Sequence, residues 1–202
     1  MTHFLFILFL SLAASTTADY FRDSTGKPVV NGGSYGMIRD MMAPDEGPIT
    51  WGISNHTRSS CPLNVIQSHY DMMPDAPNNI PYTSITFRSP LNSKFIPVGA
   101  PIDIYFNTRN SPCKKSLKWS VKPAKAAKSF NLVAGDKNPR YKGSFKVVIP
   151  KNRNDYVYRL MYCFKINSCL EVGNSDSFYN WEVLGITFEP KKNNFWAFDF
   201  VV

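Results

Sequence analysis

The sequence predicts an all-β protein built as a sandwich or barrel, and three observations support this fold class. The chain of 202 residues contains 15 Pro, 11 Gly and 14% aromatic residues, a composition that disfavours a helical bundle. Short runs rich in β-branched and aromatic residues recur along the chain, and turn-forming residues separate almost all of them. With 44% hydrophobic residues the chain can form a real core, and we expect a single domain.

About twelve short strands are predicted from these runs. In the clearest of them the apolar residues Leu117, Trp119 and Val121 alternate with polar ones, as expected of a strand with one buried and one solvated face. The same Trp–x–Val spacing returns at Trp181 and Val183, which is a weak sign of internal repetition. The predicted strands cover residues 34–38, 48–53, 63–67, 83–87, 102–106, 117–122, 129–133, 144–149, 156–163, 169–172, 179–188 and 195–201.

Glycine, proline, asparagine and aspartate mark the reversals between these strands. These residues supply the positive or fixed φ angles that tight turns need. The clearest predicted turns are residues 31–33, 44–47, 135–139 and 150–152.

The N-terminal segment resembles a secretory signal peptide. Residues 4–12 (FLFILFLSL) form an apolar run too short to span a bilayer, and small residues follow it up to Ala18. We therefore expect residues 1–18 to be removed and residues 19–202 to form the mature domain, which is secreted to the extracellular space or the vacuole. No later segment reaches transmembrane length, so no membrane span is predicted.

The 4 cysteines of a secreted chain are expected to form two disulfides, for which three pairings exist. Cys163 and Cys169 flank a potential hairpin tip, so spacing favours a local bridge between them and leaves Cys61 to pair with Cys113. The chain has no Cys-x-x-Cys motif and few histidines, so neither a metal site nor any other cofactor is predicted.

The charge of the chain favours acidic partners without identifying one. Lys and Arg exceed Asp and Glu by 23 to 15, and six lysines fall within residues 114–128. This basic segment is either an anion-binding patch or, as we favour, a solvated strand face whose lysines discourage edge pairing. Nucleic acid is not an expected partner, because few aromatic residues are interspersed with the basic ones.

The sequence argues against an enzyme. It contains no Gly-x-Ser-x-Gly, His-Glu-x-x-His, Gly-x-Gly-x-x-Gly or phosphate-loop motif, and the mature chain would offer only His56 and His69 as imidazole bases. His56 lies within Asn55-His56-Thr57, an N-glycosylation sequon, so a glycan on Asn55 would place it on a solvated loop.

Residues 19–35 (DYFRDSTGKPVVNGGSY) resemble the opening of plant Kunitz-type protease inhibitors of the soybean trypsin inhibitor kind. The matching positions are Asp23, Gly26, Pro28 and the run 31–35, and residues 61–67 (CPLNVIQ) are similar to the family's Cys-Pro-Leu-x-Val-x-Gln strand. The inferred disulfides also have the family's arrangement. The resemblance covers the whole mature chain and implies a β-trefoil of twelve strands in three pseudo-repeats. We expect a monomer.

The resemblance also implies a substrate-like inhibitory loop. In this family an exposed loop enters the protease cleft, its P1 side chain fills the specificity pocket, and the signature Asn, here Asn31, bonds loop carbonyls. The alternative role for Asn31 is only to begin the Asn-Gly-Gly turn. The segment expected to match the family's Ser-Pro-Tyr-Arg-Ile-Arg-Phe lies within 78–87. Its predicted inhibitory residues are Pro81, Tyr82, Thr83, Ser84, Ile85 and Thr86.

This segment departs from the family motif in two ways. One extra residue lies between Tyr82 and Phe87, so P1 is Ser84 or Thr83 depending on the alignment, and no Arg or Lys occurs from 78 to 87. The sequence therefore predicts a secreted protease inhibitor that is not specific for trypsin. Its target would be another endopeptidase or a carboxypeptidase. The alternative is a non-inhibitory β-trefoil binding, storage or defence protein that uses its basic surface or its loops.

Overall fold

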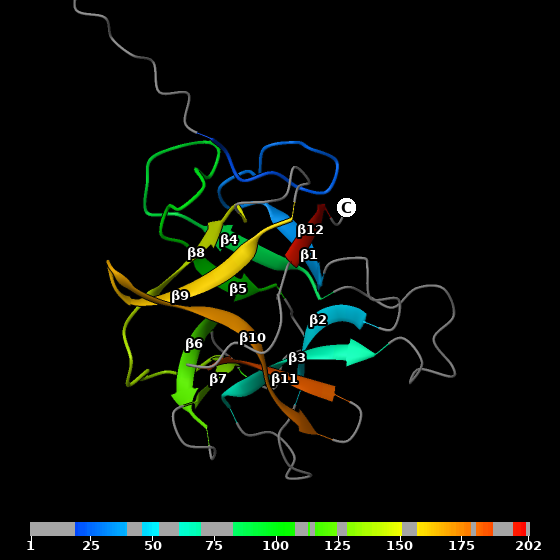
Figure 1. Cartoon of the computed structure of the whole chain (residues 1–202), viewed down its shortest axis with the longest axis vertical. Helices are drawn as coiled ribbons and strands as arrows, with labels where there is room; N and C mark the ends of the chain where they lie inside the picture. The colour runs from blue at the N-terminus through cyan, green and yellow to red at the C-terminus, as the bar shows by residue number, and fades with distance from the viewer. Residues whose placement is uncertain are drawn as a thin grey trace, which may run out of the picture.

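A computed structural model describes residues 19–39, 46–52, 61–69, 83–107, 113, 116–124, 129–150, 157–178, 181–187 and 196–200. These residues form twelve β-strands and no helix, so the predicted fold class is confirmed (Figure 1). The predicted signal peptide lies outside them. The strands are β1 (Ser34–Arg39), β2 (Glu46–Gly52), β3 (Leu63–His69), β4 (Ile85–Arg88), β5 (Asp103–Phe106), β6 (Leu117–Pro123), β7 (Ser129–Ala134), β8 (Ser144–Val148), β9 (Arg159–Lys165), β10 (Ser168–Phe178), β11 (Trp181–Thr187) and β12 (Trp196–Phe200).

Each predicted run overlaps one of these strands, and two of the differences at the strand ends are informative. β10 continues to Phe178 because it pairs with β11 along this length around a bulge between Asn174 and Asp176. Small and polar residues with low strand propensity hid this extension from the sequence pattern. β4 begins at Ile85, two residues after the predicted start, and this shift affects the functional site.

Three hairpins, β2–β3, β6–β7 and β10–β11, define the symmetry of the molecule. Their second strands pair with one another in a triangle, through Leu63↔Ala134, Gly185↔Asn131 and Val183↔Ile66. Figure 1 shows these hairpins in its lower half and β1, β4, β5, β8, β9 and β12 above them. This threefold arrangement is a β-trefoil, as predicted.

The internal repetition is real, but the Trp–x–Val match predicted from the sequence was wrong. Trp119 lies on the first strand of its hairpin, β6, whereas Trp181 lies on the second strand of its hairpin, β11. The β-propensity of tryptophan made the two strand positions look alike.

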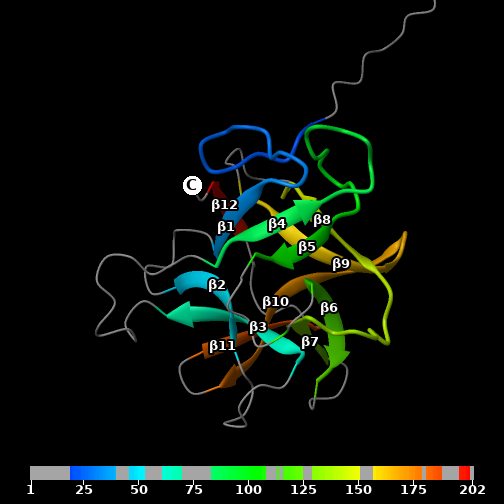
Figure 2. The same cartoon turned by 180° about the vertical axis from the view of Figure 1, so that it is seen from behind.

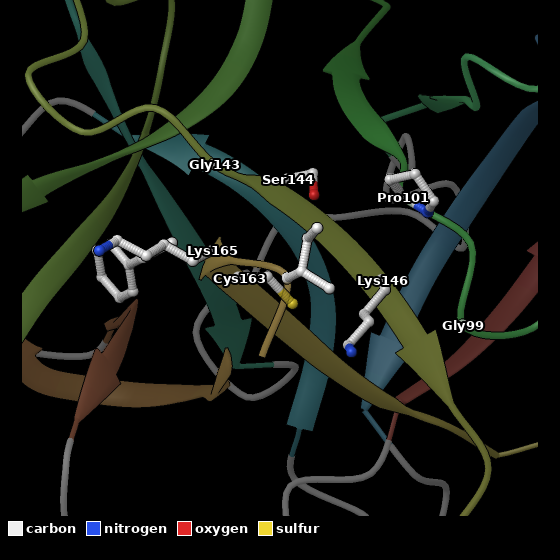
Figure 3. Close-up of a pocket in the computed structure, with 9 residues that line it drawn as sticks. Gly99, Pro101, Gly143, Ser144, Lys146, Cys163 and Lys165 are labelled. Atoms are coloured by element: carbon white, nitrogen blue, oxygen red, sulfur yellow. The ribbon is translucent and has the colours of Figure 1, made fainter. Parts of the chain in front are cut away.

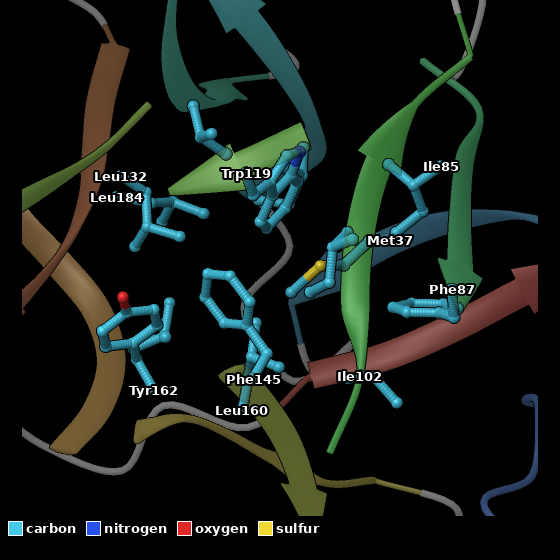
Figure 4. Packing of buried hydrophobic residues seen from close by; sticks show 14 of the residues in the cluster. Met37, Ile85, Phe87, Ile102, Trp119, Leu132, Phe145, Leu160, Tyr162 and Leu184 are labelled. Carbon is cyan, nitrogen blue, oxygen red and sulfur yellow. The ribbon is translucent and has the colours of Figure 1, made fainter. Parts of the chain in front are cut away.

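The core fills the space between the upper strands and the hairpins. Trp119, only 2% exposed, lies between Phe106 and Phe145 at ring-centroid distances of 5.1 and 6.1 Å. Phe145 in turn contacts Tyr162 at 5.0 Å. Figure 4 shows Trp119, Phe145 and Tyr162 packed among aliphatic side chains that include Leu132 and Leu184. Leu117 and Val121 are also buried and Lys118 and Lys122 are exposed, as the alternation predicted, but Ser120, which the alternation places on the solvated face, is buried.

Both predicted disulfides are present. Cys61 bonds to Cys113 across 52 positions, and Cys163 bonds to Cys169 at the tip of the β9–β10 hairpin. In the chain-entropy model the long bridge contributes about 4 kcal/mol to stability.

The segment before β1 and the segment after β4 lie side by side at one end of the barrel. Both views show this contact, in blue and green (Figures 1 and 2). Backbone bridges Tyr20↔Pro97 and Val30↔Phe95 connect the two segments.

Candidate functional site

The segment before β1 is held in shape by Asp23, whose side chain is buried. Its Oδ1 accepts hydrogen bonds from the backbone N–H groups of Thr25 and Lys27 at 3.0 and 2.9 Å and from the Thr25 hydroxyl at 2.7 Å. Gly26 completes this turn with a φ of 82°, a conformation that residues with a Cβ rarely adopt. Asp23 and Gly26, which both match the family's N-terminal signature, therefore have a structural role.

Asn31 bonds a neighbouring loop through its side chain. Its Nδ2 lies 3.2 Å from each of the carbonyl oxygens of Ser89, Leu91 and Ser93, and its Oδ1 accepts from the Ser89 N–H at 2.9 Å. Its backbone N–H also donates to the Lys94 carbonyl at 2.9 Å. A single asparagine thus contacts the loop at four residues along its length.

The turn that positions Asn31 depends on Tyr35. The Tyr35 phenol lies under the turn, is 1% exposed, and accepts a hydrogen bond from the Val30 N–H at 2.8 Å. Burial raises the pKa of this phenol. The hydrogen bond from Val30 lowers the pKa by a smaller amount, so the pKa is raised overall. A Cβ on Gly33 would lie 2.9 Å from Tyr35 Cε2 and 3.1 Å from the Val30 carbonyl oxygen. Gly33 is therefore required for this close approach.

The loop itself, residues 89–95, is short and internally bonded. Ser93 N–H donates to the Leu91 carbonyl at 2.8 Å, which forms a three-residue turn with Asn92 at its apex. The Ser93 hydroxyl donates to the Phe95 carbonyl at 2.7 Å. Pro90, Leu91, Asn92 and Lys94 are exposed, whereas Ser89, Ser93 and Phe95 are half-buried. The loop therefore has partly buried residues at both ends and at Ser93, and exposed residues at its apex.

Both ends of the loop are fixed to the barrel. Before it, the Phe87 carbonyl accepts from the Gly32 N–H at 2.8 Å. After it, Ile96 is fully buried and exchanges backbone hydrogen bonds with Phe21 and Val29 at 2.9 and 3.1 Å. The loop is thus a projection between two fixed points.

The predicted inhibitory segment 81–86 is buried at its C-terminal end, so the expected exposure of Ile85 and Thr86 is corrected. Ile85 and Thr86 belong to β4, are 0% and 5% exposed, and pair with Phe106 and Tyr105. Thr83 and Ser84 are half-buried. Pro81 and Tyr82 lie outside the described residues, as do the sequon residue Asn55 and most lysines of the basic segment.

Asn107 ties this part of the chain to the barrel. Its backbone N–H donates to the Ser84 carbonyl at 2.7 Å, and its side chain donates to the hydroxyls of Ser84, Thr86 and Ser34. The hydroxyl oxygens of Thr83 and Thr50 are also 2.6 Å apart.

The sequence held a signal that would have found the loop at 89–95. Residues 89–95 read Ser-Pro-Leu-Asn-Ser-Lys-Phe, which keeps the Ser, the Pro, the basic residue and the Phe of the family's Ser-Pro-Tyr-Arg-Ile-Arg-Phe without any insertion. The earlier segment shares the Pro-Tyr pair and a later Phe but needs an extra residue. The Pro-Tyr pair at residues 81–82 obscured the better match, whose Pro lies nine residues further on.

A shallow pocket of ≈ 320 Å³ lies elsewhere, between β8 and the tip of the β9–β10 hairpin (Figure 3). Lys146, Lys165 and the 90% exposed Ile166 line it, and its described lining residues include no His, Asp or Glu. Among the described residues no group of three or more His, Cys, Asp or Glu is placed to hold a metal ion. No helix long and apolar enough to cross a membrane occurs in the part of the chain that the structure describes.

Comparison with known proteins identifies the family. Residues 21–196 match the legume Kunitz family model, described as trypsin and protease inhibitor. A Kunitz-type trypsin inhibitor-like protein of Pisum sativum is 30% identical over 182 residues, which cover 86% of this chain and 78% of the relative. A chymotrypsin inhibitor of Erythrina variegata is 29% identical over 141 residues, covering 70% of this chain and 73% of the relative. The chain belongs to the Kunitz-type family of trypsin and protease inhibitors.

Solved structures agree on the fold. Soybean trypsin inhibitor, in its complex with porcine pancreatic trypsin, superposes with a TM-score of 0.71 at 22% identity, covering 91% of this chain and all of the inhibitor. The similarity confirms the β-trefoil.

Proposed function

We propose that this protein is a substrate-like protease inhibitor and that residues 89–95 are the loop it presents to the protease. The observation that carries the proposal is the contact between the Asn31 carboxamide and the backbone of Ser89, Leu91 and Ser93. This is the role that the family resemblance assigns to the signature asparagine. In the family motif P1 stands three residues before the final Phe, which makes Asn92 the P1 residue and Asn92–Ser93 the scissile pair.

The physical basis of inhibition is preorganisation. A loop already held in one shape loses little conformational entropy when it binds, so more of the contact energy appears as affinity. The hydrogen bonds to Asn31 and the fixed ends at Phe87 and Ile96 supply this restraint.

The long disulfide supports a slowly reversible, substrate-like mode. If a protease hydrolyses the Asn92–Ser93 peptide bond, the new carboxylate and amine belong to separate pieces of chain. Cys61 lies before this bond and Cys113 after it, so their disulfide joins the two pieces. Because Asn31 also contacts both sides of the bond, the cut ends would remain close enough to be rejoined.

The proposed P1 residue argues against potent inhibition of trypsin. Trypsin's pocket is built around a buried carboxylate, and a neutral Asn would leave that charge unpaired at a cost of about 3 kcal/mol or more. Soybean trypsin inhibitor forms a complex with trypsin, and a relative from Erythrina is named a chymotrypsin inhibitor. We infer that the fold and the braced loop are shared in this family while the P1 residue differs.

The test is a gain of function. Asn92→Arg supplies the missing cation and is expected to convert the protein into a stoichiometric trypsin inhibitor, whereas the wild type inhibits trypsin about 100-fold less or not at all. Ser84→Arg is the matched control, because it places the same cation at the P1 position of the alternative segment. Trypsin inhibition by Ser84→Arg and not by Asn92→Arg would overturn the proposal.

We also infer that the protein is secreted, which the apolar run at residues 4–12 and the two disulfides support. N-terminal sequencing of the protein purified from its native source tests this. A mature chain that begins at Asp19 is expected, and a retained Met1 would contradict secretion by this signal.

A further inference from the structure

The Asn92 side chain is exposed at the apex of the braced loop. The backbone on either side is held, because the Leu91 carbonyl accepts from both the Ser93 N–H and Asn31 Nδ2, and the Ser93 carbonyl accepts from Asn31 Nδ2 as well. No hydrogen bond within the described part of the chain involves the Asn92 side chain itself. Its carboxamide is therefore available to an external partner.

We propose that the target is an endopeptidase that cleaves after asparagine, with Asn92 as the residue its specificity pocket recognises. This inference rests on the proposed function, since it takes residues 89–95 as the inhibitory loop. It adds the substrate class of the target, which neither the fold nor the family relationship specifies.

The chemistry of the carboxamide determines which pocket fits. Asn92 offers two N–H donors and one carbonyl acceptor on a side chain only two carbons long. A pocket that selects it must be shallow and must present both an acceptor and a donor. A deep apolar pocket would leave these polar groups without hydrogen-bond partners, which disfavours binding.

The residues beside Asn92 define the flanking preferences of the same enzyme. Before it, Leu91 is 45% exposed and Pro90 is also exposed, so the preceding subsites should accept apolar side chains. Two residues after it, Lys94 is exposed with its Nζ 5.2 Å from the centre of the Phe95 ring. The target should therefore tolerate a cation at the second position after the cleaved bond.

The experiment measures inhibition of a purified asparagine-specific endopeptidase on a fluorogenic peptide ending in Asn. The wild-type protein is expected to inhibit it stoichiometrically. Asn92→Asp keeps the size of the side chain but replaces the amide donors with a carboxylate, and should weaken inhibition by about 1,000-fold at neutral pH. Asn167→Asp, at an exposed position in the turn between β9 and β10, is the control for the change in charge and should inhibit like the wild type.

Two further measurements separate this inference from the proposal on which it rests. Asn92→Arg should lose inhibition of the asparagine-specific enzyme while it gains inhibition of trypsin. After long incubation with the asparagine-specific enzyme, mass spectrometry should find a cut after Asn92, with the two pieces separating only when the disulfides are reduced.

The outcomes are distinguishable. If Asn92→Arg inhibits trypsin but the wild type does not inhibit the asparagine-specific enzyme, the inhibitory loop stands and the proposed target is wrong. Equal inhibition by Asn92→Asp and the wild type would also overturn recognition of the carboxamide. If neither the wild type nor Asn92→Arg inhibits its respective enzyme, both the loop assignment and the target fail.

Discussion

Replacing Asn31 with alanine should separate the strength of inhibition from the stability of the fold. The Asn31 carboxamide has two N–H hydrogens that are shared among three carbonyls, and one oxygen that accepts from Ser89. Counting this as three hydrogen bonds of about 1 kcal/mol each, the loop loses about 3 kcal/mol of restraint.

The loss should appear as loop opening because residues 89–95 project from the barrel. If the restrained shape is the binding-competent one, its equilibrium constant against the open loop falls by about 100-fold, and the inhibition constant rises by up to the same factor. The free energy of global unfolding should fall by less, because an open loop regains conformational entropy.

The assay uses the Asn92→Arg background and trypsin, so that it does not depend on the natural target. Inhibition constants and urea unfolding curves are measured with and without Asn31→Ala. Asn107→Ala is the control, because its Nδ2 also has three acceptors, the hydroxyls of Ser34, Ser84 and Thr86, but none of them lies in the loop. Asn107→Ala should lower stability and leave inhibition unchanged. If Asn31→Ala and Asn107→Ala affect inhibition equally, Asn31 is not the brace of an inhibitory loop.

Three further predictions concern the scaffold. Gly33→Ala should destabilise the protein by about 1–3 kcal/mol in urea unfolding, because the new Cβ would lie 2.9 Å from Tyr35 Cε2; an unchanged midpoint would contradict this close packing. Replacing Cys61 and Cys113 with serine should cost about 4 kcal/mol and let a chain cut after Asn92 separate without reductant; pieces that stay together without the bridge would show that non-covalent contacts suffice. Burial raises the pKa of Tyr162 from 10.0 to about 12. Above pH 10 the phenol therefore loses its proton in the unfolded chain before it does so in the folded protein, and the free energy of unfolding should fall by up to about 3 kcal/mol as the pH approaches 12. The control Tyr162→Phe should flatten this part of the pH profile.

The fold was accessible from sequence because its determinants are local and repetitive. Alternation such as that of Leu117, Trp119 and Val121 marks a half-buried strand wherever it occurs, and the turn residues delimit it. The cysteine pairing was also accessible, since Cys163 and Cys169 lie at opposite sides of one hairpin and left a single partner for Cys61.

The location of the loop was less accessible from the sequence. Asn31 reaches it across about sixty residues of chain, and it binds backbone carbonyls, which every residue carries. No residue pattern in the loop records such a contact, so the Pro-Tyr match at residues 81–82 competed with the ungapped motif at 89–95.

Burial is what separated the two segments. Ile85 and Phe87 have the same residue types as the apolar positions of the family's inhibitory loop. In the structure, however, both are fully buried in β4, because β1 and β5 pair on either side of this strand. Residues 90–92 are exposed because β4 ends at Arg88 and the chain then projects from the barrel until the buried Ile96. Composition and periodicity were thus sufficient for the architecture, whereas the choice of loop depended on long-range strand pairing, which places one segment inside the barrel and the next one in solvent.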